Sequence, residues 1–374
     1  MRIAWITTGF SKDENDFGGA AAIHNLAREL SLNREIELVI FSFYYPINQP
    51  EYNFYNAKVF SFAEKENNSK LEKIKLWKQC RKKLIEEHNK KPFDIIHSVW
   101  SGESGYVASR LARKLNIPFI ANVCGGELAE LPEIRYGSRT KFWQRTFVDM
   151  AFERANRIVV GSSYITDKID SYYNDSVFAK VVRIPFGVDE KLFYPGKTKS
   201  SFPALVTIGS AVPVKAYNVM LNAMKAVTQK YPGARLIICG RDDKNILPQM
   251  INDLGLTNNI ELKGFVEYEN IASVLNSSDI FVLSSLYESQ NMSLIEAALC
   301  GLPLVSTGVG IAPEITDNLA EPGNPESLAE NIIRVIQNYN SESDKALLKI
   351  PELKDKFSLN KCVNSFIELY KSLV

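Results

Sequence analysis

Apolar and polar positions along the first half of the chain follow two alternating periods. Short runs rich in Val, Ile and Phe favour buried strands, and segments with apolar residues at i, i+3 and i+4 favour amphipathic helices. Strands that alternate with helices are typical of a parallel sheet covered by helices. The strands are predicted at residues 2–7, 37–43, 94–98, 119–123 and 157–160, and the helices at 20–32, 71–88 and 105–115.

The same rhythm restarts after about residue 200. Pro185, Gly187, Pro195 and Gly196 lead into the polar stretch 197–201, a composition typical of a linker. We therefore expect an α/β protein with two Rossmann-like, doubly wound domains, residues 1–196 and 197–374, whose strand ends face a common cleft. A last helix at about 360–373 fits either domain. The second set of strands is predicted at 204–208, 235–239, 260–262, 280–283 and 302–306, and the helices at 218–230, 247–254, 271–275 and 293–300.

Charge and composition exclude several classes of protein. The 44 basic and 43 acidic residues nearly cancel, which argues against a nucleic-acid partner. The five cysteines are scattered and show no metal-ligand spacing, so we expect no disulfide framework and no metal site. The sequence has neither a signal-peptide pattern nor an apolar run long enough to span a membrane, and we expect a cytoplasmic protein.

The strongest chemical signal lies between residues 288 and 303. Glu288 follows a predicted buried strand, and Glu296 lies eight residues later within the following helix. The start of such a helix offers backbone N–H groups to an anion, and carboxylates beside it can accept hydrogen bonds from sugar hydroxyls. A helix start that merely favours acidic residues is the alternative interpretation.

Together with the residues that follow it, this segment resembles the signature of the retaining glycosyltransferases of family 4, which have the GT-B fold. The resemblance covers most of the chain, and the order and spacing of its pieces make it specific. The matching pieces are Gly18-Gly19, Asp94–His97, Ala155–Ser163, Ile184–Asp189, Ile208-Gly209 with Lys215, Gly264–Val266, Ser278–Ser285, Glu288 to Ser306, and Gly308–Glu314.

The resemblance implies transfer of a sugar from a nucleotide donor, UDP- or GDP-linked, without a metal or a further cofactor. Lys215 is expected to neutralise the leaving phosphate and Glu288 to contact the donor sugar. Glu296 is expected to hold the ribose, while glycines let the backbone approach the diphosphate. Arg241 either contacts the base or is an exposed loop arginine. The remaining predicted donor-binding residues are Gly18, Gly19, Gly209, Ser210, Ser289, Gln290, Asn291 and Met292.

Two positions depart from the family pattern. Ser210 stands where the family usually has an arginine, and Cys124 stands where a histidine is common. Arg241 or Arg139 can supply the second positive charge. Glu127, in Gly125-Gly126-Glu127, is predicted to be an acceptor-side catalytic carboxylate. We name no general base, because the donor phosphate itself can take the acceptor proton in this family.

Other features leave alternatives open. The segment 70–91 has nine Lys or Arg against three Glu, so it is either a solvated helix face or a peripheral contact with a membrane that carries lipid-linked acceptors. The expected acceptor is a glycan or a lipid-linked glycan. A sugar-nucleotide 2-epimerase and a nucleotide-sugar-binding protein without catalysis are the alternatives. We predict that His97 lies in the core or a cleft wall, and that His24 and His88 lie at the surface.

Overall fold

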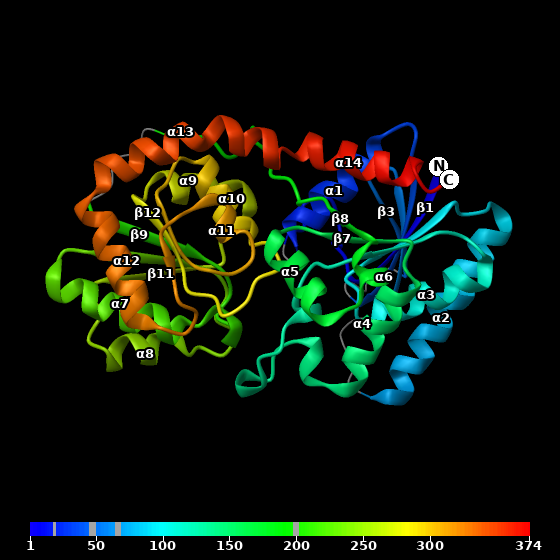
Figure 1. Cartoon of the computed structure of the whole chain (residues 1–374), viewed down its shortest axis with the longest axis horizontal. Helices are drawn as coiled ribbons and strands as arrows, with labels where there is room; N and C mark the ends of the chain where they lie inside the picture. The colour runs from blue at the N-terminus through cyan, green and yellow to red at the C-terminus, as the bar shows by residue number, and fades with distance from the viewer. Residues whose placement is uncertain (18–19, 45–49, 64–68, 197–201) are drawn as a thin grey trace. The chain divides into compact units, whose positions relative to one another are not determined.

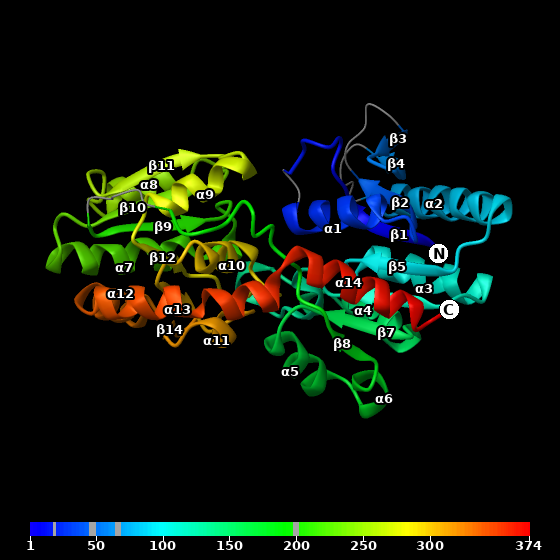
Figure 2. The same ribbon diagram turned by 90° about the horizontal axis from the view of Figure 1, so that it is seen from above.

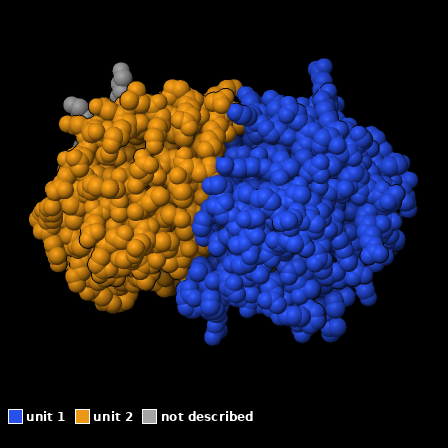
Figure 3. Space-filling model, viewed as in Figure 1, with its two compact units in different colours: residues 1–187, 359–374 blue, residues 188–358 orange. Residues whose placement is uncertain are grey.

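The computed structural model describes residues 1–17, 20–44, 50–63, 69–196 and 202–374. The chain forms two compact units, residues 1–187 with 359–374, and residues 188–358 (Figure 3). The units divide at Gly187, whereas the linker-like composition suggested a boundary at residue 196. The last helix, α14 (Leu359–Lys371), belongs to the first unit.

The first unit is built on an eight-stranded sheet in the order β3-β4-β2-β1-β5-β6-β7-β8 (Figure 1). Its strand pairs are parallel except for β3 and β4, which form an antiparallel pair at one edge. The strands are β1 (Arg2–Gly9), β2 (Glu37–Tyr44), β3 (Glu51–Phe54), β4 (Ala57–Ala63), β5 (Ile95–Val99), β6 (Phe119–Asn122), β7 (Arg157–Val160) and β8 (Val181–Arg183). The helices are α1 (Ala21–Leu32), α2 (Lys70–Lys90), α3 (Glu103–Leu115), α4 (Phe142–Arg154), α5 (Ser163–Tyr172), α6 (Asp175–Phe178) and α14.

Both faces of this sheet are covered, as successive residues of β5 show. His97 faces α14, where its Nδ1 lies 2.8 Å from the hydroxyl of Tyr370. Ser98 points the opposite way, towards α3, where a Cβ on Gly105 would lie 3.5 Å from its Oγ. Because side chains alternate across a strand, α14 and α3 cover opposite faces. Figure 2 shows the two helices in the same unit from above.

A buried hydrogen-bonded trio attaches α14 to the sheet. Tyr370 accepts a hydrogen bond from Trp5 Nε1 at 3.1 Å and also contacts His97, and all three side chains are fully buried. Burial lowers the pKa of His97 to about 3, so its imidazole is neutral. The trio places two polar contacts inside an otherwise apolar interface, where losing one of them would cost folding free energy.

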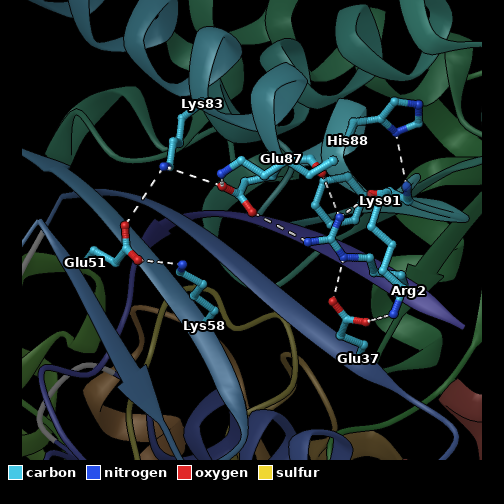
Figure 4. A network of polar contacts seen from close by, with 10 residues as sticks. Arg2, Glu37, Glu51, Lys58, Lys83, Glu87, His88 and Lys91 are labelled. Carbon is cyan, nitrogen blue, oxygen red and sulfur yellow. Dashed lines mark hydrogen bonds and ion pairs between the residues drawn. The ribbon is translucent and has the colours of Figure 1, made fainter.

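The amino end of the same sheet is held by a network of ion pairs (Figure 4). Arg2 is 7% exposed and its Nε donates to Glu37 at 2.7 Å. Its other nitrogens donate to the carbonyl of Glu87 at 2.8 Å and face the Glu87 carboxylate at 3.6 Å. The guanidinium also lies 4.3 Å from the ring centroid of Phe93. The contacts with Glu37 and Glu87 join β1 to β2 and to the end of α2, and the Phe93 contact joins it to the loop before β5.

The second unit has a six-stranded parallel sheet in the order β11-β10-β9-β12-β13-β14. Its strands are β9 (Ala204–Ile208), β10 (Arg235–Cys239), β11 (Ile260–Gly264), β12 (Ile280–Leu283), β13 (Leu304–Thr307) and β14 (Leu319–Ala320). Its helices are α7 (Tyr217–Lys230), α8 (Leu247–Asp253), α9 (Tyr268–Asn276), α10 (Met292–Leu299), α11 (Ala312–Ile315), α12 (Pro325–Gln337) and α13 (Tyr339–Phe357).

Two hydrophobic cores lie on the two faces of this second sheet. Leu205 packs into the core formed with α7, α8 and α12, and the next residue, Val206, packs into the core formed with α9, α10 and α13. In β12, Val282 likewise packs into the first of these cores and Phe281 into the second. The near-continuous apolar runs that predicted these strands therefore reflect burial on both sides.

The prediction for His24 was wrong. The residue is 1% exposed, and its Nδ1 lies 3.0 Å from Ser11 Oγ and 3.2 Å from the carbonyl of Asp16. The loop that follows β1 folds over this side of α1, and the ring of Phe17 lies 4.0 Å from the imidazole. Burial lowers the pKa of His24 to about 4.

None of the helices among the described residues combines the length and the apolar character that crossing a membrane requires.

We expect Tyr370→Phe to destabilise the first unit by about 1–3 kcal/mol, because it leaves buried groups of Trp5 and His97 unpaired. The measurement is urea unfolding followed by tryptophan fluorescence, which reports on the first unit since all four tryptophans lie there. Tyr172→Phe, at a half-buried position on α5, is the control. Equal midpoints for the two variants would contradict a stabilising role of the trio.

Candidate functional site

The strand order of the second sheet reverses between β9 and β12. The chain runs outward from β9 through β10 to β11 and then returns to β12 on the other side of β9. In doubly wound sheets, ligands bind at the carboxyl ends of the strands beside such a reversal. Lys215 follows β9 in a 3-10 turn (Pro213–Lys215), and Glu288 follows β12. The topology therefore brings together two residues that the sequence marked separately.

Lys215 and Glu288 form an ion pair at this position. The Lys215 Nζ lies 2.6 Å from Glu288 Oε1, and Ser285 Oγ donates to the same oxygen at 2.7 Å. The two charged side chains are 22% and 14% exposed, so a ligand can reach them. Ser284 Oγ donates to the carbonyl of Lys215 at 2.7 Å, which fixes the turn against β12. The hydroxyls of two serines that follow β12 thus hold both members of the pair, Ser285 through the Glu288 carboxylate and Ser284 through the Lys215 carbonyl.

The loop from Glu288 to Asn291 takes its shape from Gly310. This glycine has a φ of +60°, and a Cβ there would lie 2.8 Å from Glu288 Cβ and 2.9 Å from the carbonyl of Gln290. That carbonyl accepts a hydrogen bond from Ile311 N at 2.9 Å. Asn291, at a φ of +75°, caps α10 by accepting a hydrogen bond from Leu294 N at 2.8 Å. The loop that contains Ser289 and leads to Met292 is therefore tightly constrained.

Gly209 lies in a close approach of two loops. Gly240 has no side chain, and a Cβ there would lie 2.1 Å from the carbonyl oxygen of Gly209. Tyr217 donates to that carbonyl at 2.6 Å. Beside Ser210, the amide of Ala211 donates to the carbonyl of Arg241 at 2.7 Å. The segments that contain Ser210 and Arg241 are therefore neighbours.

The Arg241 side chain lies over an aromatic ring. Its guanidinium carbon is 4.8 Å from the ring centroid of Phe265, and both residues are exposed. The two planar groups form a surface suited to stacking against a flat ring system.

Glu296 lies deeper in the unit than the other predicted site residues. Its side chain is 5% exposed, and burial raises the pKa of its carboxyl to about 7, although a hydrogen bond from Tyr268 works in the opposite direction. A carboxylate has acceptor positions beyond the one that Tyr268 uses. The group therefore titrates close to neutral pH and can accept further hydrogen bonds when ionised.

The first unit has a pocket at its own reversal of strand order, between β1 and β5. Its volume is about 500 Å³. Trp100 in its wall has a φ of +66°, which is uncommon for a bulky residue and marks a locally constrained backbone. The pocket is lined by Thr8, Gly9, Tyr44, Trp100, Gly102, Gly126, Glu127, Gly137, Ser138 and Gln144.

Glu127 lines this pocket and connects two of the loops that form it. One carboxylate oxygen accepts hydrogen bonds from Ser101 N at 3.0 Å and Cys124 N at 3.2 Å, and the other accepts one from Gly125 N at 2.7 Å. Burial raises the pKa of Glu127, while these backbone amides act in the opposite direction. The structure thus shows Glu127 as a link between the ends of β5 and β6, and its catalytic role stays a prediction.

Three further predicted features are placed as follows. Gly18 and Gly19 lie outside the described residues. Arg139 lies in the first unit, 3.8 Å from the ring centroid of Tyr172 and 3.9 Å from Asp149. It is therefore engaged within that unit. Cys124 is half-buried, and burial raises the pKa of its thiol.

Sequence reasoning assigned no role to several residues that shape the site. Ser285, Thr307 and Tyr268 act through hydrogen bonds to Glu288, to the carbonyl of Ser285 and to Glu296. A lone Ser, Thr or Tyr gives no such signal in a sequence. Gly310 lies in the Gly308–Glu314 stretch, but its positive φ is visible only in the structure.

Comparison with known families identifies the chain. Residues 189–348 match the family described as Glycosyl transferases group 1, and residues 18–192 match Glycosyltransferase Family 4. The two matches together cover both units, so the chain belongs to the family 4 glycosyltransferases. The site at the reversal between β9 and β12 lies within the first of these matches.

Individual relatives agree with this assignment. An uncharacterized glycosyltransferase of Methanocaldococcus jannaschii is 28% identical over 301 residues, 78% of either chain. One of the phosphatidylinositol N-acetylglucosaminyltransferase subunits of Arabidopsis thaliana is 33% identical over 44% of this chain and 39% of its own length. The 2-deoxystreptamine N-acetyl-D-glucosaminyltransferase of Niallia circulans is 24% identical over 60% of this chain and 58% of its own.

Solved structures confirm the GT-B fold. The sucrose-phosphate synthase of Thermosynechococcus elongatus has a TM-score of 0.83 at 17% identity, over 100% of this chain and 99% of that one. The Anabaena protein HepE, solved in complex with UDP-glucose, has a TM-score of 0.75 at 18% identity over 100% of both chains.

We expect Gly310→Ala to displace the loop that carries Glu288, since the added Cβ meets Glu288 and the backbone of Gln290. Displacing a binding group by about 1 Å is enough for large losses, so we expect nucleoside-diphosphate affinity to fall about tenfold or more. Calorimetric titration and thermal unfolding measure the effect. Gly308→Ala is the matched control, because a Cβ at Gly308 meets nothing within 4 Å. Equal affinities would show that the loop does not depend on Gly310.

Proposed function

We propose that this glycosyltransferase moves a sugar, with retention of anomeric configuration, from a UDP- or GDP-linked donor to a glycan or lipid-linked acceptor. The observation that carries the proposal is the Lys215–Glu288 ion pair, 2.6 Å long, at the reversal of strand order in the second unit. UDP is the first candidate nucleotide, since HepE, which shares the fold, was solved with UDP-glucose.

In this proposal, different residues of the second unit bind different parts of the donor. Lys215 neutralises the leaving diphosphate, and Glu288 accepts a hydrogen bond from the donor sugar. The backbone from Ser289 to Met292 lines the sugar and phosphate at the start of α10. The Arg241–Phe265 surface takes the base, and ionised Glu296 accepts hydrogen bonds from the ribose hydroxyls.

The bond changes need no protein base in this scheme. The bond between the sugar and the diphosphate breaks, the acceptor oxygen forms a bond on the same face, and the leaving phosphate oxygen takes the acceptor proton. Glu127 already accepts hydrogen bonds from three backbone amides, which favours a positioning role. Charge on the diphosphate is balanced by Lys215 and by backbone amides rather than by a metal ion.

The acceptor is assigned to the pocket of the first unit. Trp100 and Tyr44 give it aromatic walls, against which sugar rings and apolar groups can pack. Two relatives act, by their names, on phosphatidylinositol and on 2-deoxystreptamine, which are both polyhydroxylated ring compounds. A membrane contact by residues 70–91 fits the lipid-linked form of this acceptor.

We expect UDP or GDP to bind with or without chelator, and Lys215→Ala to weaken that binding about tenfold or more through loss of a charge-assisted hydrogen bond. Glu288→Ala is expected to reduce turnover more than nucleotide affinity. Calorimetric titration with UDP, GDP and ADP measures binding, and Lys225→Ala, on the exposed side of α7, is the control. If no nucleotide binds, Ser210 marks a lost donor site and catalysis is excluded.

The affinity for the nucleotide is expected to rise between about pH 6 and pH 8, because Glu296 ionises near pH 7 and only the carboxylate can accept from both ribose hydroxyls. The affinity rises rather than falls with pH because burial raises the pKa of Glu296, so that the carboxyl is protonated at the lower pH and ionised at the higher one. The titration is repeated with Glu296→Gln, which cannot ionise and separates this effect from ionisation of the phosphate. Parallel pH profiles for parent and variant would contradict the role of Glu296.

A further inference from the structure

Large apolar side chains are exposed at the starts of two helices in the first unit. Leu71 is 80% exposed and Ile74 43% exposed on α2, and Phe142 and Trp143 are 64% and 63% exposed on α4. The rings of Phe142 and Trp143 lie 5.3 Å apart. Single exposed apolar residues are ordinary, but a group of this size marks an interaction surface. We call these four residues the α2–α4 patch.

A ring contact between the helices shows that the patch is one surface. Trp77 of α2 lies 5.6 Å from Phe147 of α4. Ile74 and Leu71 precede Trp77 by one and two turns of α2, and Trp143 precedes Phe147 by one turn of α4. The exposed residues therefore extend from a shared packed contact towards the beginnings of both helices.

The surroundings of the patch are basic. Five exposed cations accompany it on the same turns of the two helices, namely Lys70, Lys75, Lys78, Lys141 and Arg145. Glu72 is the exposed acidic residue among those turns. The net charge of the whole chain is only +1, so the excess of positive charge is local. Aromatic and aliphatic groups ringed by Lys and Arg are complementary to the interface of an anionic bilayer.

The patch also adjoins the pocket assigned to the acceptor. Gln144 lines that pocket, and it lies between Trp143 and Arg145 in the first turn of α4. One turn of helix therefore presents a polar side chain to the pocket and aromatic side chains to solvent. Any partner that binds the α2–α4 patch would therefore lie next to the pocket.

We infer that the α2–α4 patch docks the first unit on an anionic lipid bilayer and so brings a membrane-borne acceptor to the pocket beside Gln144. The inference rests on the proposed function for the acceptor, while the docking itself is independent of it. The exposed apolar side chains enter the interface, and the cations bind lipid phosphates. Salt weakens the second contribution more than the first.

The test is sedimentation of the full chain with vesicles of phosphatidylcholine mixed with phosphatidylglycerol, compared with phosphatidylcholine alone. We expect binding to the anionic vesicles and a loss of about tenfold or more in Phe142→Ser/Trp143→Ser, because each buried aromatic ring is worth about tenfold or more. Leu71→Ser is expected to weaken binding too. Leu348→Ser is its matched control, since Leu348 is 79% exposed and lies on α13 of the other unit.

A second readout locates the contact. Trp143 is the most exposed tryptophan, so bromine-labelled lipids are expected to quench its fluorescence in the parent and to quench Trp143→Phe much less, although that variant keeps an aromatic ring and still binds. Lys75→Glu/Lys78→Glu is expected to reduce binding to anionic vesicles at low salt.

Three outcomes would overturn the inference. They are vesicle binding that the serine variants do not change, no binding of the parent to anionic vesicles, and a concentration-dependent dimer in lipid-free sedimentation that Phe142→Ser/Trp143→Ser abolishes. Nucleotide titration of every variant separates this inference from the proposed function. Normal UDP or GDP affinity without vesicle binding would contradict only the docking inference. Absence of nucleotide binding in the parent would contradict only the proposed donor site.

Discussion

The order of strands in the two parallel sheets is the constraint on which the rest of the structure depends. In a parallel sheet every strand ends at the same edge, so the loops that follow the strands gather there. A reversal of strand order leaves a gap between two of these loops, because the helices on either side leave in opposite directions. In the second unit this gap lies between the loops that follow β9 and β12 and is bridged by Lys215 and Glu288. In the first unit it lies between the loops that follow β1 and β5 and contains the pocket lined by Trp100. Each candidate site thus follows from topology before any side chain is considered.

Non-glycine residues with positive φ occur at both of these places. Ala216, which follows Lys215, has a φ of +48°, Asn291 has a φ of +75°, and Trp100 has a φ of +66°. Conformations of this kind cost about 1–3 kcal/mol each and persist only where the surroundings enforce them. Here the surroundings are hydrogen bonds from Ser284 and Thr307 in the second unit and from the amides around Glu127 in the first. The stability of the two-sided cores therefore sustains loops that would not keep these shapes alone.

Particular elements show what the sequence was able to predict. Strands β9, β10 and β12 were placed correctly because burial on both sides makes them continuous apolar runs between polar turns. The β3–β4 pair was missed, since it lies at a sheet edge where burial is one-sided and the pattern weaker. His24 was misplaced because a helix pattern cannot reveal a loop that folds over it. The attachment of α14 rests on Trp5 and Tyr370, which are 365 positions apart, and no local pattern reports such a contact. At the site, the motif indicated Lys215 and Glu288, while the hydrogen bonds of Glu127 are visible only in the folded structure.

The ion pair at the proposed donor site has a consequence for the proposed chemistry. The Lys215 ammonium and the Glu288 carboxylate satisfy one another, and Ser285 holds the carboxylate oxygen in place. A diphosphate that enters must compete with Glu288 for the ammonium, and a sugar hydroxyl must then replace the ammonium at the carboxylate. A whole nucleotide-sugar supplies both groups, whereas a bare diphosphate supplies only the first and leaves Glu288 short of a partner. In the proposed scheme, the pair would therefore favour the complete donor over its product and promote release of the nucleotide after transfer. In the same scheme, an arginine at position 210, as the resemblance implies for the family, would hold the product more tightly than Ser210 does.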